Sequence, residues 1–284
     1  MNPTLSQEQI DFFNLEGYLV IKSFYDMNRD IEPIHFAIYN IIGLLIKKYN
    51  LPFIQAPFSS ETFDSCFQDL ITHDRKLGSE AYDAVKQIPA FVRLVSSERH
   101  DSVFSQIRKN SFPGVAAGGY GIRMDHPGEE KFRAGWHQDY TSQFRSIDGL
   151  VFWSPLVQIT ESIGPLQICP GSHKEGMVPV HTQNGKEPGK TGAYATVLKD
   201  EENLLSKYPV VHVLASPGDL LILDFLVIHA SGYNVSNRSR WSMQMRHFNF
   251  NDPTGIKIGW AGSFAAGKSI ESVHPELIAD RKGV

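Results

Sequence analysis

A histidine and an aspartate in one short segment are the first candidates for chemistry. The segment Trp136-His137-Gln138-Asp139 places the two side chains two residues apart. In an extended strand, residues two apart point to the same face of the sheet. The imidazole and the carboxylate would then emerge side by side, an arrangement suited to a divalent metal ion. Because such a pair occurs by chance in many proteins, it needs a third ligand from another strand.

His229 is the candidate for the third ligand. It follows an apolar run over 220–228, which itself follows a Pro-Gly-Asp turn at 217–219. We therefore expect it to end a buried strand and to point into a cavity. Two histidines and one carboxylate form the facial triad of non-haem Fe(II) oxygenases, in which open positions remain for a chelating cosubstrate and dioxygen. The alternative for His229 alone is a hydrogen-bonded core histidine.

Arg240 lies eleven residues beyond His229, and Ser242 follows two residues later on the same strand face. An arginine on the interior face of a β-barrel is costly unless an anion pairs with it. Its planar guanidinium suits a carboxylate, which predicts a carboxylate-bearing ligand beside Arg240 and Ser242. The alternative is an internal salt bridge with an aspartate or glutamate.

The elements that must position these residues fall into two regions. Residues 1–110 are mainly helical: Ser6 is a candidate N-cap of a helix that ends at Gly17, apolar residues recur at helical spacing over 31–49, and helices continue over 66–107 with breaks near Gly78 and Pro89. From Ser111 onward, short strands alternate with turns. The predicted strands span 119–124, 149–157, 166–169, 210–214, 219–228 and 240–249.

This order predicts an α+β fold with a mainly β core. Many short strands without regular intervening helices favour a jelly roll or barrel over 111–250, with the helices as an outer layer. Residues 251–284 form a C-terminal extension. The candidate ligands are 92 residues apart, so we expect one barrel in a single domain over 1–284. The polar stretch 176–208 is too long for a simple connector and is typical of a functional loop or a surface insertion.

Composition excludes several classes of protein. The chain has 284 residues and a formal net charge of −4, which disfavours nucleic acid as a partner. No apolar run is long enough to span a bilayer, and the N-terminus lacks the pattern of a signal peptide. The two cysteines, Cys66 and Cys169, are expected to be reduced thiols. We therefore expect a cytoplasmic protein without a membrane partner, and the sequence makes no prediction of its oligomeric state.

The chain resembles the phytanoyl-CoA dioxygenase family of Fe(II)- and 2-oxoglutarate-dependent oxygenases. The resemblance rests on the segment from Trp136 to Asp139 and on the motifs at Gly164–Gly176 and Pro217–Trp241. The opening helix followed by Gly17–Asp26 is also similar. This resemblance implies a double-stranded β-helix, a cupin-like jelly roll flanked by helices. It also implies three cofactors or cosubstrates: Fe(II), 2-oxoglutarate and dioxygen.

The resemblance also implies roles for individual residues. His137, Asp139 and His229 match the iron ligands, and Arg240 matches the arginine that pairs with the distal carboxylate of 2-oxoglutarate. Ser231 matches a hydroxyl that helps to bind this cosubstrate, and Trp153 matches an aromatic wall of the same pocket. His173 lies in a family motif outside the metal site, where a structural role is expected. Halogenating relatives lack the carboxylate, so the presence of Asp139 favours hydroxylation, with release of succinate and CO2.

The substrate is predicted only as a small polar or anionic metabolite. Alternation places Arg240, Ser242, Gln244 and Arg246 on one strand face, and Arg123 shares a face with Asp125. Arg123 and Arg246 could receive an anionic group of the substrate. The alternative is a network of internal ion pairs, such as Arg246 with Asp125. The residues next to the ligands are further candidates, since Tyr140 is expected to line the pocket with Gln244, and Gln138 either lines it or braces the outer layer.

Two other classes of function remain as alternatives. A cupin-like isomerase or hydrolase would use the same triad with Zn or Mn and without 2-oxoglutarate, and Arg240 together with Ser231 argues against it. A non-catalytic jelly-roll binding protein has no need of two histidines and an aspartate around one point, so the triad argues against that class as well.

Overall fold

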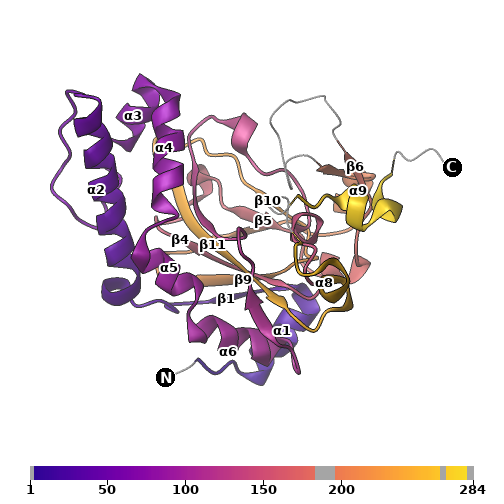
Figure 1. Cartoon of the computed structure of the whole chain (residues 1–284). Helices are drawn as coiled ribbons and strands as arrows, with labels where there is room; N and C mark the ends of the chain where they lie inside the picture. The colour runs from indigo at the N-terminus through magenta and orange to yellow at the C-terminus, as the bar shows by residue number, and fades with distance from the viewer. Residues whose placement is uncertain (1–2, 183–195, 263–266, 280–284) are drawn as a thin grey trace.

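The computed structural model describes residues 3–182, 196–262 and 267–279. Most of its helices lie within the first 110 residues and most of its strands follow, as the sequence predicts (Figure 1). No helix within the described ranges is long and apolar enough to cross a membrane. Cys66 and Cys169 are both free thiols.

The first helix has clear signals at both ends. Helix α1 (Gln7–Glu16) begins at Ser6, whose side chain accepts a hydrogen bond from the Gln9 amide while the Gln9 side chain accepts one from the Ser6 amide. It ends at Gly17, which adopts the left-handed conformation that glycine tolerates best. Strand β1 (Tyr18–Ile21) follows directly, so the helix end sets where the first strand enters the sheet.

Five more helices complete the helical layer. They are α2 (Glu32–Lys48), α3 (Phe67–His73), α4 (Arg75–Val85), α5 (Pro89–Val95) and α6 (Glu98–Ile107). The predicted break at Gly78 is wrong. The break falls at Asp74, whose side chain caps α4, whereas Gly78 lies inside α4 where a Cβ would be 2.6 Å from the Arg75 side chain and 3.2 Å from Ile71. Gly78 therefore serves close packing and not a turn.

The large sheet is antiparallel and has the strand order β1-β9-β4-β11-β2, with β3 also paired to β11. Its members besides β1 are β2 (Pro113–Val115), β3 (Gly121–Asp125), β4 (Leu150–Pro155), β9 (Leu220–Asp224) and β11 (Arg240–Asn249). A second sheet has the order β10-β5-β8 and contains β5 (Leu166–Ile168), β8 (Val211–Val213) and β10 (His229–Ser231). Two sheets in this arrangement agree with the predicted jelly roll.

The predicted strand over 219–228 is longer than the strand in the structure, because β9 covers only its first part and residues 225–228 form a turn. Strand β9 ends at Asp224 in the large sheet, and β10 starts at His229 in the small sheet. Between them the chain turns, because the Asp224 carboxylate accepts a hydrogen bond from the Leu226 amide. His229 therefore begins a strand of the second sheet, and does not end the apolar strand as expected.

The predicted polar loop over 176–208 also contains regular structure. Strand β6 (Val180–Thr182) pairs with β7 (Thr196–Leu198), and the short helix α7 (Glu201–Leu205) follows. The stretch from 183 to 195 lies outside the described residues.

The two faces of β11 have different neighbours. On the outer face, Trp241 packs on Phe67 with ring centroids 4.6 Å apart, and Phe152 of β4 stacks on His100 of α6 at 4.8 Å. One continuous hydrophobic cluster joins the helices to this face. On the inner face, Arg240 donates a hydrogen bond to Ser231 of the small sheet. The inner face of the large sheet thus looks toward β10.

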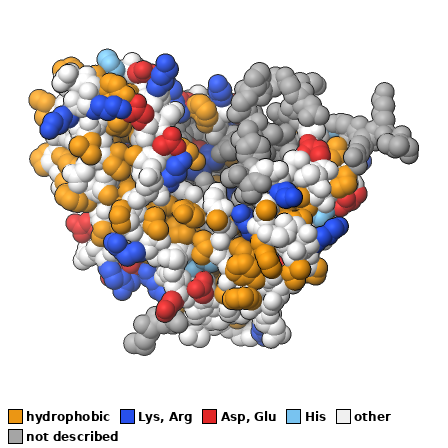
Figure 2. Space-filling view, viewed as in Figure 1, with side chains coloured by type: hydrophobic (Ala, Val, Ile, Leu, Met, Phe, Trp, Pro, Cys, Tyr) orange, Lys and Arg blue, Asp and Glu red, His pale blue; other side chains and the backbone are white. Residues whose placement is uncertain are grey.

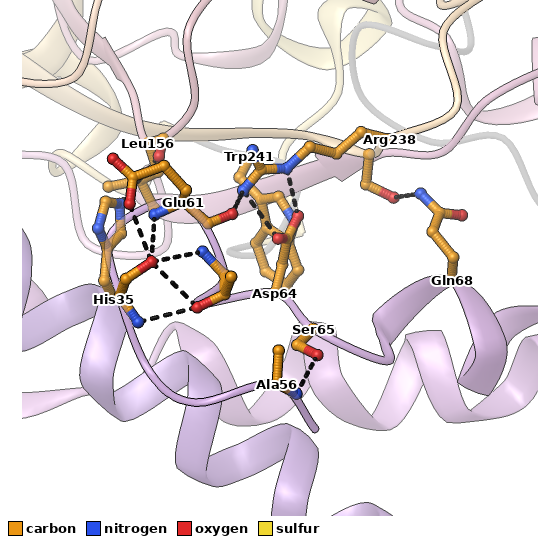
Figure 3. Close-up of polar contacts among 12 residues, drawn as sticks. His35, Ala56, Glu61, Asp64, Ser65, Gln68, Leu156, Arg238 and Trp241 are labelled. Atoms are coloured by element: carbon orange, nitrogen blue, oxygen red, sulfur yellow. Dashed lines mark hydrogen bonds and ion pairs between the residues drawn. The ribbon is translucent and has the colours of Figure 1, made fainter. Parts of the chain in front are cut away.

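The start of β11 is fastened to the helical layer by Asp64 (Figure 3). Its carboxylate accepts hydrogen bonds from Arg238 at 2.8 and 2.9 Å and from the Trp241 indole at 3.2 Å. On the same side, His35 of α2 bonds the Leu156 carbonyl at 2.8 Å. The contacts of Asp64 fix Arg238 and Trp241, which lie before and after Arg240 in the sequence, relative to the helical layer.

The C-terminal extension packs against the core beside the β6–β7 ribbon (Figure 1). It contains α8 (Pro253–Ile258), α9 (Ile270–Val273) and the 3-10 turn η8 (Pro275–Leu277). The Ala279 amide donates to the Val180 carbonyl at 2.9 Å. Phe250 contacts both Phe112 and Trp260, two exposed side chains. Figure 2 shows that hydrophobic side chains also gather elsewhere on the visible face of the molecule. The extension is therefore part of the folded unit.

Candidate metal centre

Three side chains predicted as metal ligands converge on one point. The ligating atoms of His137, Asp139 and His229 all lie within 4.8 Å of one another, and all three side chains are buried. His137 and His229 also form an antiparallel backbone bridge, with N–H to O=C distances of 3.0 and 3.1 Å. Two ligands 92 residues apart in sequence are thus joined by their own backbones.

Both imidazoles present the same nitrogen to this point. Nδ1 of His137 lies 2.8 Å from the Gly135 carbonyl, and Nδ1 of His229 lies 3.0 Å from the Val227 carbonyl. A carbonyl oxygen only accepts, so each Nδ1 must carry the proton, which leaves Nε2 as a lone-pair donor. Burial, followed by the neighbouring His137, lowers the pKa of His229 to about 4. His229 is therefore neutral at physiological pH, as a metal ligand must be.

Asp139 does not sit on a regular strand as predicted. Gln138 has extended backbone angles, which keeps His137 and Asp139 on one side, but Asp139 begins a 3-10 turn, η3 (Asp139–Ser142). Its carboxylate is 1% exposed and accepts hydrogen bonds from Arg246 at 3.0 and 3.2 Å. Burial would raise the pKa of Asp139, but the charge of Arg246 and the contact with His137 hold it well below its usual range. The carboxylate is therefore ionised.

This donor set fits ferrous iron. Two imidazoles and one ionised carboxylate meet at one buried point, which is the ligand set of the 2-His-1-carboxylate centres. The tautomers are already set by the two backbone carbonyls, so the residues need no rearrangement of protons to bind a divalent cation.

Arg240 lies on the inner face of β11 and is 1% exposed. Its guanidinium donates to Asp125 at 2.8 and 3.3 Å, to the Ser231 hydroxyl at 2.9 Å and to the Gly164 carbonyl. The internal salt bridge that the sequence leaves open is therefore present, with Asp125 as the partner. Burial would raise the pKa of Asp125, but Arg123 and Arg240 lower it to about 2.

Two more residues expected beside the cosubstrate share this inner face. The Ser242 hydroxyl is buried and has no hydrogen-bond partner among the described residues. Trp153 of β4 lies opposite Gln244 in the register of the sheet and is 4% exposed. An unpaired buried hydroxyl on the strand face of Arg240 is the feature expected where a polar ligand binds.

The arginines predicted to receive an anionic substrate are both engaged within the protein. Arg246 pairs with Asp139, and not with the Asp125 suggested by the sequence, while Arg123 pairs with Asp125. Inward charges are thus matched inside the fold, as the alternative interpretation holds. Gln244 accepts a hydrogen bond from Arg246 at 3.0 Å.

Tyr140 and Gln138 connect the centre to outer segments. The Tyr140 hydroxyl lies 2.7 Å from Nε2 of His274 in the C-terminal extension, so its polar end is tied there. The Gln138 side chain bonds the backbone of Gly176, Leu226 and Val178, which is the bracing role considered for it.

His173 lies away from the triad, at the end of α1. Its ring bonds the Asn14 carbonyl at 3.1 Å and packs on Gly17, where a Cβ would come within 2.5 Å of Nδ1. This placement agrees with the structural role expected for it.

Sequence reasoning missed two contacts of the site. The pairing of Arg246 with the ligand Asp139 and that of Asp125 with Arg240 join residues more than 100 positions apart. The only available signal was that Arg240 and Arg246 share one strand face, which predicts inward charges but not their partners.

Comparison with known proteins identifies relatives of this fold and site. A model of the phytanoyl-CoA dioxygenase (PhyH) family matches residues 13–242. The human peroxisomal phytanoyl-CoA dioxygenase is 24% identical over 98% of this chain and 76% of its own length. A probable phytanoyl-CoA dioxygenase of Caenorhabditis elegans is 30% identical over 40% of this chain and 35% of its own.

Solved structures show the same fold at lower identity. EctD from S. alaskensis with 2-oxoglutarate and 5-hydroxyectoine superposes with a TM-score of 0.52 and 17% identity, over 86% of this chain and 76% of its own. The non-haem α-ketoglutarate-dependent carbocyclase SnoK from nogalamycin biosynthesis gives 0.53 and 15%, over 88% of each chain. The double-stranded β-helix is thus confirmed. With the family match and the His-Asp-His triad, this chain belongs to the phytanoyl-CoA dioxygenase family and is an iron- and 2-oxoglutarate-dependent oxygenase.

Proposed function

We propose that this enzyme hydroxylates an unactivated C–H bond of a small polar molecule, while 2-oxoglutarate is converted to succinate and CO2. The observation that carries this proposal is the buried His137–Asp139–His229 triad with Arg240 on the facing sheet. Bound iron supplies the activation of dioxygen, which side chains alone do not provide. The presence of Asp139 as third ligand supports hydroxylation over halogenation.

The residues around Arg240 are proposed to hold 2-oxoglutarate by its distal carboxylate. Arg240 carries five N–H donors in a planar fork, and Ser231 and Ser242 add hydroxyls on either side. Asp125 and Gly164 hold the guanidinium in place from the other side. In our proposal the keto-acid end of the cosubstrate points to the triad, and Trp153 forms an aromatic wall.

The ion pairs inside the barrel favour a polar substrate without a strong anionic group. Arg246 is committed to Asp139 and Arg123 to Asp125, so an anionic substrate would have to compete with a carboxylate already in contact. Gln244 remains the proposed polar contact of the substrate, and Tyr140, whose hydroxyl is bonded to His274, is proposed to line the pocket with its ring. We do not extend the acyl-CoA substrate of the named relatives to this chain, because one fold supports many substrates.

We also propose that the chain is a single domain that works in a reducing, cytoplasmic environment. Helices and sheet share one hydrophobic cluster, which supports the single domain. The free thiols of Cys66 and Cys169 support the proposal of a reducing environment. The need to keep iron in the ferrous state supports it as well.

The test of the function uses the visible absorption of the metal centre. The metal-free protein receives Fe(II) and 2-oxoglutarate without oxygen, and we expect a weak charge-transfer band from the bidentate keto acid. The His137→Ala variant should give no band. A wild-type protein that binds Fe(II) but gives no band would favour a cupin-like isomerase or hydrolase, and one that binds neither would favour a non-catalytic binding protein.

The substrate requires a second measurement. Small polar metabolites are screened for stimulation of succinate release in the presence of oxygen, with His137→Ala as the background. A stimulating compound that returns with one added oxygen atom confirms hydroxylation, whereas a desaturated or cyclised product would contradict it.

A further inference from the structure

We propose that Arg246 is a positioning residue of the metal centre, whose guanidinium fixes the Asp139 carboxylate in the orientation that a metal ion needs. The proposal rests on the proposed function, because that function identifies the metal ion of the site as iron. Arg246 lies on β11, six residues beyond Arg240 and on the same inner face.

The geometry of the pair is that of a fork on a carboxylate. Nε of Arg246 donates to Oδ2 of Asp139 at 3.2 Å, and Nη2 donates to Oδ1 at 3.0 Å. With one nitrogen on each oxygen, the carboxylate cannot rotate about its Cβ–Cγ bond without breaking a charge-assisted hydrogen bond. Asp139 is 1% exposed, so water offers no replacement.

The guanidinium is itself held from two further sides. Nη1 donates to the Gly119 carbonyl at 3.2 Å, and Nη2 donates to Oε1 of Gln244 at 3.0 Å. The backbone of Arg246 is fixed by the register of β11, where it lies opposite Val151 of β4. The orientation of the carboxylate is thus set by β11 and by the segment before β3.

Asp139 needs such a partner more than the histidines do. Each histidine ring is oriented by the carbonyl two residues before it, Gly135 for His137 and Val227 for His229. Asp139 begins a 3-10 turn outside the sheet, so the strand geometry does not set its side chain. The side chain of Arg246 orients the carboxylate, just as the two backbone carbonyls orient the imidazoles.

Binding of Co(II) to the metal-free protein tests this role without 2-oxoglutarate or turnover. We expect Arg246→Lys, which keeps the charge but loses the fork, to weaken Co(II) binding by about 10- to 100-fold in calorimetry. The visible Co(II) spectrum should change as well, because the carboxylate no longer has a single orientation. Arg238→Lys is the matched control, since Arg238 also forks onto a carboxylate outside the site, that of Asp64, whose side chain is 10% exposed.

Two results would overturn the proposal. One is a Co(II) affinity of Arg246→Lys within twofold of the wild type. The other is an equal loss caused by Arg246→Lys in an Asp139→Asn background, which would mean that Arg246 does not act through Asp139. If circular dichroism shows Arg246→Lys to be unfolded, Gln244→Ala tests the same link, and an unchanged Co(II) affinity and spectrum would overturn the proposal.

Discussion

Arg240 pairs with a carboxylate of the protein itself, that of Asp125. Asp125 is also paired with Arg123, so two guanidinium groups share one carboxylate. Because Arg240 shares this carboxylate with Arg123, its guanidinium remains suited to a second carboxylate. The cluster therefore reconciles the two interpretations of Arg240, because an internal salt bridge orients the residue that we propose as the contact of the cosubstrate.

The Arg240→Ala variant should bind 2-oxoglutarate more weakly, whereas its affinity for the metal ion should stay unchanged. Loss of charge-assisted hydrogen bonds of about 1.5–3 kcal/mol corresponds to a roughly 10- to 100-fold higher apparent Kd. Titration of the charge-transfer band with 2-oxoglutarate measures this, and Co(II) calorimetry checks that the triad is intact. Arg93→Ala, on the exposed face of α5, is the control. An unchanged 2-oxoglutarate affinity would show that Arg240 does not bind the cosubstrate.

The strands differ in how well the sequence predicts them. Strand β11 spans Arg240–Asn249 as predicted, because polar and apolar residues alternate between a barrel interior and a helix-covered face. The apolar run over 220–228 was predicted as one strand, yet only Leu220–Asp224 is a strand, and residues 225–228 form the turn that leads to the second sheet. Most residues of this turn are buried like those of the strand, so the end of the strand leaves no trace in hydropathy. The site residues were predictable by type and spacing, whereas the turn at Asp139 was not.

The link between the helical layer and β11 carries a testable consequence. Asp64→Ala removes the acceptor for Arg238 and for the Trp241 indole, and we expect a loss of about 2 kcal/mol in the free energy of unfolding. Urea denaturation measures this loss. Asp83→Ala breaks the exposed pair with Lys86 and should cost less than about 0.5 kcal/mol. Equal effects of the two substitutions would mean that Asp64 does not fasten β11.

For the whole molecule, the sequence predicts the order of the layers but not the polar groups between them. Helices before strands, one jelly roll and the helical outer layer follow from periodicity and turn residues. The histidines that lie between sheet and helices, such as His100 and His247, gave no local signal. Their burial depends on which helix covers which strand, and a single sequence does not encode that as a pattern.

His247 should make the stability of the protein depend on pH. Its ring is 0% exposed, neither nitrogen has a hydrogen-bond partner among the described residues, and burial lowers its pKa to about 4. The unfolded chain, with a histidine pKa near ~6.5, binds the proton more readily. The contribution of His247 to stability is therefore complete above pH ~6.5 and falls by about 1.4 kcal/mol per pH unit down to pH ~4.

The measurement is the free energy of unfolding at pH 7 and pH 5. His247→Phe should lose about 2 kcal/mol less than the wild type over this interval. His73→Phe, at an exposed position of α3, should behave as the wild type does. The same pH slope in His247→Phe and in the wild type would contradict the prediction.

The pairing of β1 with β9 has a consequence for how the chain folds. Tyr18 lies opposite Leu223, so an edge strand formed near the N-terminus must wait for a partner about 200 residues later. The two histidine ligands likewise pair across 92 residues. Such distant contacts make folding slow, because loop closure must precede the gain from pairing. During synthesis the helices can form early, yet the sheet can close only after β9 and β11 have left the ribosome, and until then its apolar strands are exposed to aggregation.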